Sequence, residues 1–398
     1  MSDTNEQSVG LKNPFDSWKS IVISLYMTLI GYGVLVGIPV ISTAWVTLLG
    51  FSEVEVGRVA GADLGGLSLG AVVTAIFISR VNRRHLVVIG LSLAVVANGL
   101  CISVVDYDQV LWLRLLSGIG SGIYTAVAVS SLGASSKPAR AYNAMLFAFA
   151  FSQALEMHFL PMLSMAGIYS TFIICFLLTI PFIGWIPAHG SAKIADTVAD
   201  DALSAQPIPK FVPWLCLAAM VVTYINIGAY WTYIELAAAS DQADAEWVGQ
   251  VLTLSSFCSL VGCLFATILS NRYGLLRPLL ITLTTMAVIV GMLANGITDQ
   301  NILISVFSFN CLWIFIDVYQ MSTIANVDKT GRFAALMPGA QGLGQIIGPN
   351  LAASILGLNW GYSGVFMMCA GAAIVAMLLY AFMYLRFRRT IPALAYAS

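Results

Sequence analysis

Residues 111–122 read LWLRLLSGIGSG, an apolar and glycine-rich stretch that contains one arginine, Arg114. The stretch belongs to a mostly apolar run of about 25 residues, which is long enough to cross a lipid bilayer. An arginine at the centre of a membrane-spanning helix costs about 2.5–3.5 kcal/mol. We therefore expect Arg114 to have an acidic partner or a functional role, and the remaining chain to form a membrane-embedded frame around it.

The composition of the whole chain supports this interpretation. Of the 398 residues, 59% are hydrophobic and 9% are charged, with a mean hydropathy of +0.88, whereas soluble domains carry about 25% charged residues. A membrane-spanning helix needs about 20 apolar residues, and the sequence contains twelve such runs. We predict an all-α integral membrane protein whose helices lie near residues 19–43, 56–78, 86–105, 109–133, 141–165, 167–187, 211–238, 247–269, 277–297, 300–325, 333–356 and 361–385.

The distribution of positive charge predicts the orientation, because Lys and Arg concentrate in cytoplasmic loops. If both termini are cytoplasmic, the cytoplasmic segments hold 16 of the 18 Lys and Arg, and the other two are Arg58 and Arg114. The first 18 residues lack the apolar core of a cleaved signal peptide, and Asn-x-Ser/Thr sequons are absent. With the short loops, these features favour a multi-pass protein of a bacterial inner membrane. The seven Cys show no metal-binding spacing, so we expect neither a disulfide framework nor a metal site.

The longest polar stretch divides the chain into two parts of similar length. Residues 189–210 are rich in Ala, Asp and Ser and are typical of a flexible linker. We therefore predict one six-helix half at 1–188 and another at 211–398. When the chain is shifted by 192 residues, Arg80 aligns with Arg272 in an equivalent loop. Because arginine is rare in this sequence, the coincidence indicates an internal repeat.

Two motifs make the chain resemble the major facilitator superfamily over nearly its full length. The family's loop between its second and third helices reads G-x-L-x-D-R-x-G-R-R, and this chain has Ser79 in place of the acid and Asn82 in place of the second glycine. The repeat copy of this loop has Asn271 in place of the acid. The family's fourth-helix motif is an arginine followed by small residues. The matching residues are Arg80, Arg83, Arg84, Arg272 and Gly274 in the loops, and Arg114, Ser117, Gly118, Gly120 and Gly122 in the helix.

The resemblance implies a transporter with two pseudo-symmetric six-helix halves, whose first, fourth, seventh and tenth helices line a central pathway. It also implies that the matching loop residues take part in the conformational change. The two missing acids bear on the family's acid-based latch between the halves and not on the fold. The glycine–proline motif of the family's antiporters is absent from the fifth helix, where residues 149–161 read FAFSQALEMHFLP. This absence makes drug/proton antiport the less favoured alternative.

Five ionisable side chains other than histidine fall inside the predicted spans, and they are Asp63, Arg114, Glu156, Glu235 and Asp317. Asp63 lies about 10 Å from the outer end of its helix and Arg114 about 8 Å from the outer end of its own, at about 1.5 Å per residue. Because both helices enter from the same side, we predict an ion pair between these two residues. The pair either only locks two helices together or acts as a proton- or substrate-sensitive switch.

Two predicted helices carry a polar stripe. In the tenth helix, Asn310, Trp313, Asp317 and Gln320 follow one another at helical spacing and share one face. A helix surrounded by lipid would not carry such a face, so we expect it to line a central cavity. The seventh helix shows a similar stripe, in which Glu235 either faces the cavity or reaches the outer water. The expected substrate-binding residues are Arg114, Tyr32, Tyr224, Trp231, Asn310, Trp313, Asp317, Gln320, Gln153 and Gln345.

Glu156 in the fifth helix has no cation near it in the sequence. Burial disfavours the charged form of a carboxyl group, so Glu156 suits a proton carrier. His158 lies about 200° around the helix from Glu156, so the two side chains do not face each other. His158 serves either as a packing residue or as a relay. We assign proton coupling to Asp63, Arg114, Glu156, Asp317 and Glu235.

We conclude from the sequence that the protein is a secondary active transporter of a small organic solute, coupled to protons and working by alternating access. The alternatives are an uncoupled facilitator of the same fold and proton-driven efflux of cationic or amphipathic compounds. The three His are scattered and a phosphate-binding G-x-x-x-x-G-K-[ST] loop is absent, which disfavours a membrane enzyme and an ATP-driven pump. We expect a functional monomer in the bilayer, without a cofactor and without a nucleic-acid partner. The identity of the substrate and the direction of transport stay open.

Overall fold

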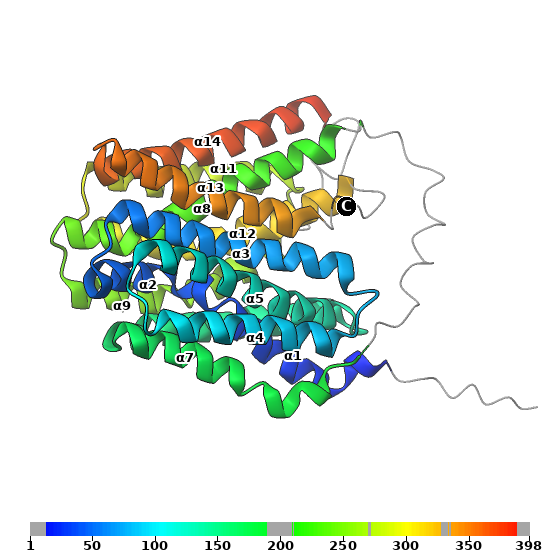
Figure 1. Ribbon diagram of the computed structural model, residues 1–398. Coiled ribbons are helices and arrows are strands. Elements are labelled where there is room, and N and C mark those ends of the chain that lie inside the picture. Colours follow the sequence, from blue (N-terminus) through cyan, green and yellow to red (C-terminus); the bar gives the residue numbers. More distant parts are fainter. Residues whose placement is uncertain are drawn as a thin grey trace, which may run out of the picture.

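A bundle of long helices makes up the computed structural model (Figure 1). The described part of the chain contains no β-strand, which confirms the predicted all-α fold. The predicted linker at 189–210 lies outside the described residues apart from Pro209. The structure describes residues 13–188, 209, 211–269, 272–327, 333 and 336–387.

The first half contains six long helical segments. The first segment is divided into α1 and α2, and the sixth continues from α7 into a 3-10 segment. Short 3-10 turns precede α1 and follow α6. The elements are η1 (Pro14–Asp16), α1 (Trp18–Gly31), α2 (Gly33–Leu49), α3 (Glu53–Phe77), α4 (Arg83–Cys101), α5 (Tyr107–Gly133), α6 (Pro138–Phe159), η2 (Leu160–Met162), α7 (Met165–Leu177) and η3 (Ile180–Trp185).

The second half also contains six long segments, two of which are composite. Ten of the twelve segments in the described chain are both long and apolar enough to cross a membrane, and the other two, α6 and α13, have similar lengths. The twelve predicted runs are therefore confirmed as helical. The elements are α8 (Phe211–Ser240), α9 (Ala245–Ser255) with α10 (Cys258–Leu269), α11 (Leu276–Gly291) with η6 (Met292–Asn295), α12 (Asp299–Val327), α13 (Met337–Gly357) and α14 (Gly361–Phe387).

Local sequence decides where the segments break. Pro161 lies in η2, and α6 ends before it at Phe159, because proline lacks an N–H and its ring blocks the preceding turn. Pro39 and Pro349 are instead accommodated inside α2 and α13. Tyr32, with φ −91° and ψ 1°, separates α1 from α2 in the middle of the first segment. The predicted run at 141–165 is thus shorter as an α-helix than expected.

The helix ends lie on two opposite faces of the bundle. The described chain begins at η1 and finishes at the end of α14 on the same face, where α8 also begins (Figure 1). We call this the linker face, because the described part of the first half ends there at residue 188 and α8 begins there at Phe211. The opposite face carries the short turns that join α2 to α3, α4 to α5, α8 to α9 and α13 to α14, and we call it the far face.

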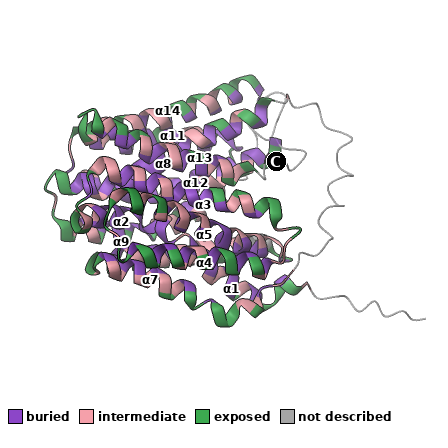
Figure 2. Cartoon of the chain, in the orientation of Figure 1, coloured by how far each residue is buried: buried purple, intermediate pink, exposed green. Residues whose placement is uncertain are grey.

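Much of the outer surface of the bundle is apolar. Leu385 is 71% exposed, and Trp112 and Ile281 are each 67% exposed. Figure 2 shows exposed residues along the outer helices of the bundle. A soluble protein would bury such side chains, whereas lipid chains solvate them without cost. The surface therefore fits a protein embedded in a membrane.

Glycines bring α3, α4 and α5 into backbone contact. A Cβ atom added to Gly118 would collide with the carbonyl of Asp63, and one added to Gly122 with the carbonyl of Leu67. Gly120, on another face of α5, would meet the backbone of α4 at 2.6 Å. Only glycine allows helices to approach so closely. The reciprocal glycines on α3 are Gly66 and Gly70, which face the α5 backbone.

The two halves meet mainly along α3 and α13, with further contacts between α2 and α8 and between α6 and α9. On α3, Gly57, Gly61 and Gly65 recur every four residues and face α13. The nearest atoms to Gly61 and Gly65 belong to the side chains of Asn350 and Ile346. α3 therefore has one glycine face toward its own half and another toward the other half.

A test of the backbone contact compares Gly122→Ala with Gly99→Ala. Gly99 lies exposed on α4, with no atom within 4 Å of an added Cβ. We expect Gly99→Ala to be neutral or to stabilise by up to about 1 kcal/mol, because alanine is the better helix former. Gly122→Ala should destabilise by about 1–3 kcal/mol, because α3 and α5 must move apart. Thermal unfolding of both purified variants in detergent measures the difference, and equal midpoints would contradict the assignment.

Candidate functional site

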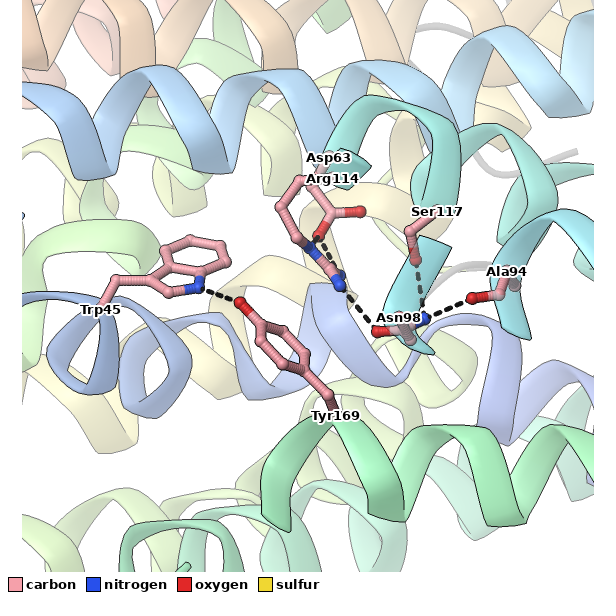
Figure 3. A network of polar contacts seen from close by, with 7 residues as sticks. All are labelled: Trp45, Asp63, Ala94, Asn98, Arg114, Ser117 and Tyr169. Atoms are coloured by element: carbon pink, nitrogen blue, oxygen red, sulfur yellow. Dashed lines mark hydrogen bonds and ion pairs between the residues drawn. The ribbon is translucent and has the colours of Figure 1, made fainter. Parts of the chain in front are cut away.

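The ion pair predicted between Asp63 and Arg114 is present (Figure 3). The Nε of Arg114 donates to Oδ2 of Asp63 at 2.8 Å, and Nη2 of Arg114 pairs with the same oxygen. Both side chains are buried, with residue exposures of 1% and 2%. Gly118 lies one turn beyond Arg114 and lets α5 reach the α3 backbone at Asp63 itself. The close helix crossing therefore fixes the geometry of the pair.

Neutral groups complete the surroundings of the guanidinium (Figure 3). Nη1 of Arg114 donates to Oδ1 of Asn98 on α4 at 2.7 Å, and Nδ2 of Asn98 donates to the hydroxyl of Ser117 at 2.9 Å. The ring of Tyr169 on α7 lies 5.5 Å from the guanidinium carbon, within the range of a cation–π interaction. Trp45 on α2 holds that ring through a hydrogen bond of 3.0 Å to its hydroxyl. Five segments of the first half thus converge on one cation.

Arg114 lies in a different environment from the one that the sequence analysis expected, and its role in substrate binding stays a prediction. We expected Arg114 to bind substrate on the wall of a cavity, but its side chain is enclosed by the first half and its three nitrogens are all bonded to Asp63 and Asn98. Asn98 was not predicted. The sequence could have indicated it, because Asn98 is a polar residue in the preceding apolar run, at the same membrane depth as Arg114.

Asp317 on α12 occupies a different environment in the second half. Its Oδ1 accepts hydrogen bonds from the hydroxyl of Tyr224 at 2.7 Å and from Nε2 of Gln341 at 2.8 Å. Asp317 is partly exposed. Gln341 on α13 is a second residue that the sequence analysis missed. It lies one turn before the predicted Gln345 on the same helix.

An aromatic cluster lies between α8 and α12 on the far-face side of Tyr224. The ring of Trp231 is nearly parallel to Phe309, at 5.8 Å and 8°, and lies 6.3 Å from Trp313. The indole N–H of Trp231 donates to the carbonyl of Val36 on α2 at 3.2 Å. Trp231 was predicted to bind substrate. The structure instead shows it 1% exposed and joined to the other half.

Three other predicted substrate-binding residues are buried and bonded within the protein. Nε2 of Gln153 on α6 donates to Oδ1 of Asn310 on α12 at 3.1 Å, and Nδ2 of Asn310 donates to Ser255 at 3.1 Å. Nε2 of Gln320 donates to Thr223 at 2.7 Å. Gln153, Asn310 and Gln320 are 5%, 1% and 0% exposed, so they connect helices and do not face an open cavity in this structure.

The remaining predicted substrate-binding residues differ in exposure. Tyr32 is half-buried and packs against Phe149, with ring centroids 5.5 Å apart. Trp313 is 8% exposed and Gln345 is 4% exposed. The predicted residues that lie together around Asp317 are therefore fewer than the sequence analysis expected.

Glu156 and Glu235 lie near the first-half helix α2. Oε1 of Glu156 accepts a hydrogen bond from the hydroxyl of Ser152 at 3.3 Å, and Oε2 lies 2.7 Å from the position of a Cβ added to Gly37. Among the described residues, Oε2 of Glu156 and Oε2 of Glu235 are buried and have no hydrogen-bond partner. His158 is exposed and its ring contacts Phe159, which favours the packing interpretation.

The predicted loop residues serve different purposes. Arg83 is 6% exposed, donates to Ser131 at 3.0 Å on α5, and lies 4.6 Å from the ring of Phe15. Arg84 donates to the carbonyl of Ile186 at 2.8 Å. Both arginines therefore join elements of the first half to one another. Gly274 has φ +72°, a conformation that favours glycine. Arg80 and Arg272 are exposed on the linker face.

The N-terminal turn η1 is bonded to the loop between α5 and α6. Asp16 accepts hydrogen bonds from the side chain and the backbone N–H of Ser136, the latter at 2.7 Å. These hydrogen bonds lower the pKa of the Asp16 carboxyl, with a smaller contribution from Lys137. The turn therefore carries a stable negative charge beside the linker-face end of α5.

Arg58 connects the two halves at the far face. Its Nη1 donates to the carbonyl and to Oδ1 of Asn350 at 3.1 and 2.8 Å, and its Nη2 donates to Ser354 at 3.0 Å. Nearby, the hydroxyl of Tyr233 on α8 donates to the carbonyl of Glu53 at 2.7 Å. The sequence analysis identified Arg58 as the sole cation on the outer side without assigning it a role.

The residues that the structure describes contain no group of three His, Cys, Asp or Glu side chains that could hold a metal ion. The carboxyl groups of the site can exchange protons, and its tyrosine, glutamine and tryptophan side chains can form hydrogen bonds.

Comparisons with known proteins agree with this arrangement. A model of the Major Facilitator Superfamily matches residues 21–327. A mutant of the nucleoside transporter NupG has a similar structure, with a TM-score of 0.70 and 12% identity over 92% of this chain and 99% of that one. The D-xylose–proton symporter gives a TM-score of 0.70 and 15% identity over 91% and 96%. The human organic anion transporter MFSD10 (TETRAN) gives 0.61 and 13% over 91% and 98%. No curated protein matches the sequence significantly.

The Asp63–Arg114 pair can be tested by removing either charge. Asp63→Asn leaves a buried guanidinium without a carboxylate and should destabilise the protein by about 3–5 kcal/mol. The double variant Asp63→Asn, Arg114→Gln removes both charges and should recover part of this loss. Thermal unfolding in detergent measures both effects. Asp108→Asn, which changes an exposed far-face acid, is the control. A midpoint for Asp63→Asn equal to that of the control would contradict a stabilising pair.

Proposed function

Because the chain belongs to the Major Facilitator Superfamily, we propose that it moves a small polar organic solute across the membrane by alternating access, driven by protons. The observation that carries the proposal is the environment of Asp317. Its carboxylate accepts hydrogen bonds from two neutral groups, and the one ion pair among the described residues lies elsewhere. An uncompensated carboxylate in a membrane helix is costly, so it suits a group that alternately binds and releases a proton.

The substrate site in this proposal lies between the halves, around Asp317. Tyr224, Gln341 and Trp313 supply hydrogen-bonding and aromatic groups from the second half, and we place Tyr32 on the first-half side of this site. Small polar ligands are bound by a few such polar groups on an aromatic wall. The similar structures include a transporter of nucleosides and a symporter of D-xylose with protons, both of which fit this description.

The charge of the site favours a neutral or cationic solute. An organic anion would need a cation as its anchor, and Arg114, the candidate for that role, is already bonded to Asp63 and Asn98. Proton-driven efflux of a cationic compound is the second candidate function, because Asp317 would attract such a compound equally well. Uptake and efflux use the same carboxyl and differ in the side from which the solute binds.

The contacts between the halves support an inward-facing state. The hydrogen bonds of Arg58 and Tyr233 close the far face. We propose that the linker face is cytoplasmic, as the distribution of Lys and Arg indicates. Alternating access then requires these bonds to break as the halves rock.

The proposed coupling predicts a specific loss in Asp317→Asn. In proteoliposomes with one-for-one coupling, each pH unit across the membrane supports about a tenfold accumulation of solute, or about 1.4 kcal/mol. We expect wild type to accumulate a screened solute and Asp317→Asn to bring it only to equal concentrations, while solute exchange without a gradient continues. Asp108→Asn is the control. Wild type that only brings the solute to equal concentrations, whatever the pH gradient, would indicate an uncoupled facilitator, and accumulation that ignores the pH gradient would contradict coupling to protons.

The proposed closure at the far face predicts that Arg58→Ala shifts the conformational equilibrium. Loss of three hydrogen bonds from a charged group should cost the closed state at least about 1.4 kcal/mol, roughly a tenfold change in population. Spin labels at Val105 and Trp360, which are 68% and 67% exposed in far-face turns of opposite halves, report the distance between the halves. We expect a larger population of long distances in Arg58→Ala than in Arg58→Lys. Identical distance distributions would show that Arg58 does not hold the far face closed.

A further inference from the structure

A small pocket of about 110 Å³ opens between the two halves beside Glu235. It lies in the far-face part of the bundle, because Glu235 is five residues from the end of α8 at Ser240. A pocket of this size has room for several water molecules beside the carboxyl. Its lining residues are Val40, Thr43, Ala44, Thr47, Leu48, Leu160, Pro161, Leu163 and Glu235.

The polar side chains that line this pocket are two threonine hydroxyls and the Glu235 carboxyl, and the Thr43 hydroxyl is close enough to donate to that carboxyl. The hydroxyl of Thr43 donates to the carbonyl of Pro39 at 3.2 Å, and that of Thr47 donates to the carbonyl of Thr43 at 2.8 Å. Both hydroxyls also have lone pairs, so they can accept hydrogen bonds in the pocket. Oε2 of Glu235 is buried and has no partner in the described part of the chain. Such a set of acceptors favours a proton or a small cation over an anion.

Trp231 separates this pocket from Asp317. Trp231 precedes Glu235 by four residues and shares its face of α8. Its bond to Val36 and its contact with Trp313 block the space between the halves one turn inward of the pocket. Tyr224, which bonds to Asp317, precedes Glu235 by eleven residues, a rise of about 16 Å. The two carboxyls thus lie on opposite sides of an aromatic partition.

Other ionisable groups occupy the elements packed around this part of α8. Glu156 lies close to the pocket lining. It precedes the lining residue Leu160 by one helical turn, and both side chains lie next to Gly37 on α2. In the described chain, Glu235 is the only ionisable residue of the lining itself. The surrounding groups are Glu156 and His158 on α6, Glu53 and Arg58 on α3, Asp317 and Asp299 on α12, Tyr362 on α14, Asp241 after α8 and Glu246 on α9.

We propose that Glu235 is the site at which the coupling proton binds from the far side while the halves are closed there. The proton binds to a carboxylate oxygen and cancels its charge, and it passes inward to Asp317 when Trp231 moves away. Proton binding and solute binding thereby occupy two separate sites with a movable ring between them. This inference rests on the proposed proton-coupled transport.

The first test needs no substrate. Dicyclohexylcarbodiimide reacts with protonated carboxyl groups in apolar surroundings, and peptide mass spectrometry locates the adduct. In oriented proteoliposomes we expect labelling of Glu235 to fall as the far-face pH rises, by about tenfold per pH unit above its midpoint. Labelling should not respond to the pH at the linker face. Labelling that follows the linker-face pH would overturn the proposal, as would suppression by Na⁺ at constant pH, which would identify a sodium site.

The second test measures transport of the solute that wild type accumulates in the proteoliposome experiment with Asp317→Asn. Glu235→Gln should lose the dependence of accumulation on far-face pH, Glu235→Asp should keep it, and Glu246→Gln, an exposed far-face acid, should behave as wild type. Exchange without a gradient shows that each variant is folded. If Asp317→Asn abolishes accumulation and Glu235→Gln does not alter its pH profile, this inference fails and the proposed function stands. If wild type shows no proton-driven accumulation, the proposed function itself fails.

Discussion

A charge in the interior of a membrane bundle must be neutralised, and the Arg114–Asp63 pair meets this requirement for the first half. The desolvation cost of two buried ions exceeds their attraction unless the geometry is close and the remaining donors are satisfied. Gly118 supplies the close geometry by bringing α5 against the carbonyl of Asp63, and Asn98 takes the remaining donor. The packing of α3, α4 and α5 and the chemistry of the pair therefore depend on each other.

The second half has the opposite electrostatic character. Asp317 is held by neutral donors, and the residues that line the pocket beside Glu235 include no cationic side chain. The fold is pseudo-symmetric while the charges are not. In the first half Asp63 and Arg114 neutralise each other, whereas Asp317 and Glu235 in the second half, like Glu156 in the first, have no cationic partner among the described residues. The sequence repeat cannot reveal this difference, because the charged residues occupy positions at which the two halves differ.

The fold and the ion pair could be predicted because each depends on one-dimensional quantities. Apolar run length determines the spans, and residue counts from the helix ends place Asp63 and Arg114 at equal depth. The direction in which each helix face points was harder to predict, because it depends on the rotation of the helix about its axis. Asn310 and Gln320 share the polar stripe of Asp317, yet they bond to Gln153 and Thr223 and are buried. A polar stripe shows that a helix avoids lipid, but a partner helix and a cavity satisfy it equally well.

The two glycine faces of α3 have different mechanical consequences. Toward α5, backbone meets backbone at Gly66, Gly70, Gly118 and Gly122, so no side chain can rearrange to relieve a displacement. Toward α13, much of the contact is made by side chains such as Asn350 and Ile346, which can change rotamer and re-form contacts one position further along. α3 is therefore fixed to α5, whereas its contacts with α13 allow the two helices to slide along each other. Larger side chains on the α3 face toward α13 would hinder the rocking of the two halves and slow turnover, even where they leave the resting structure intact.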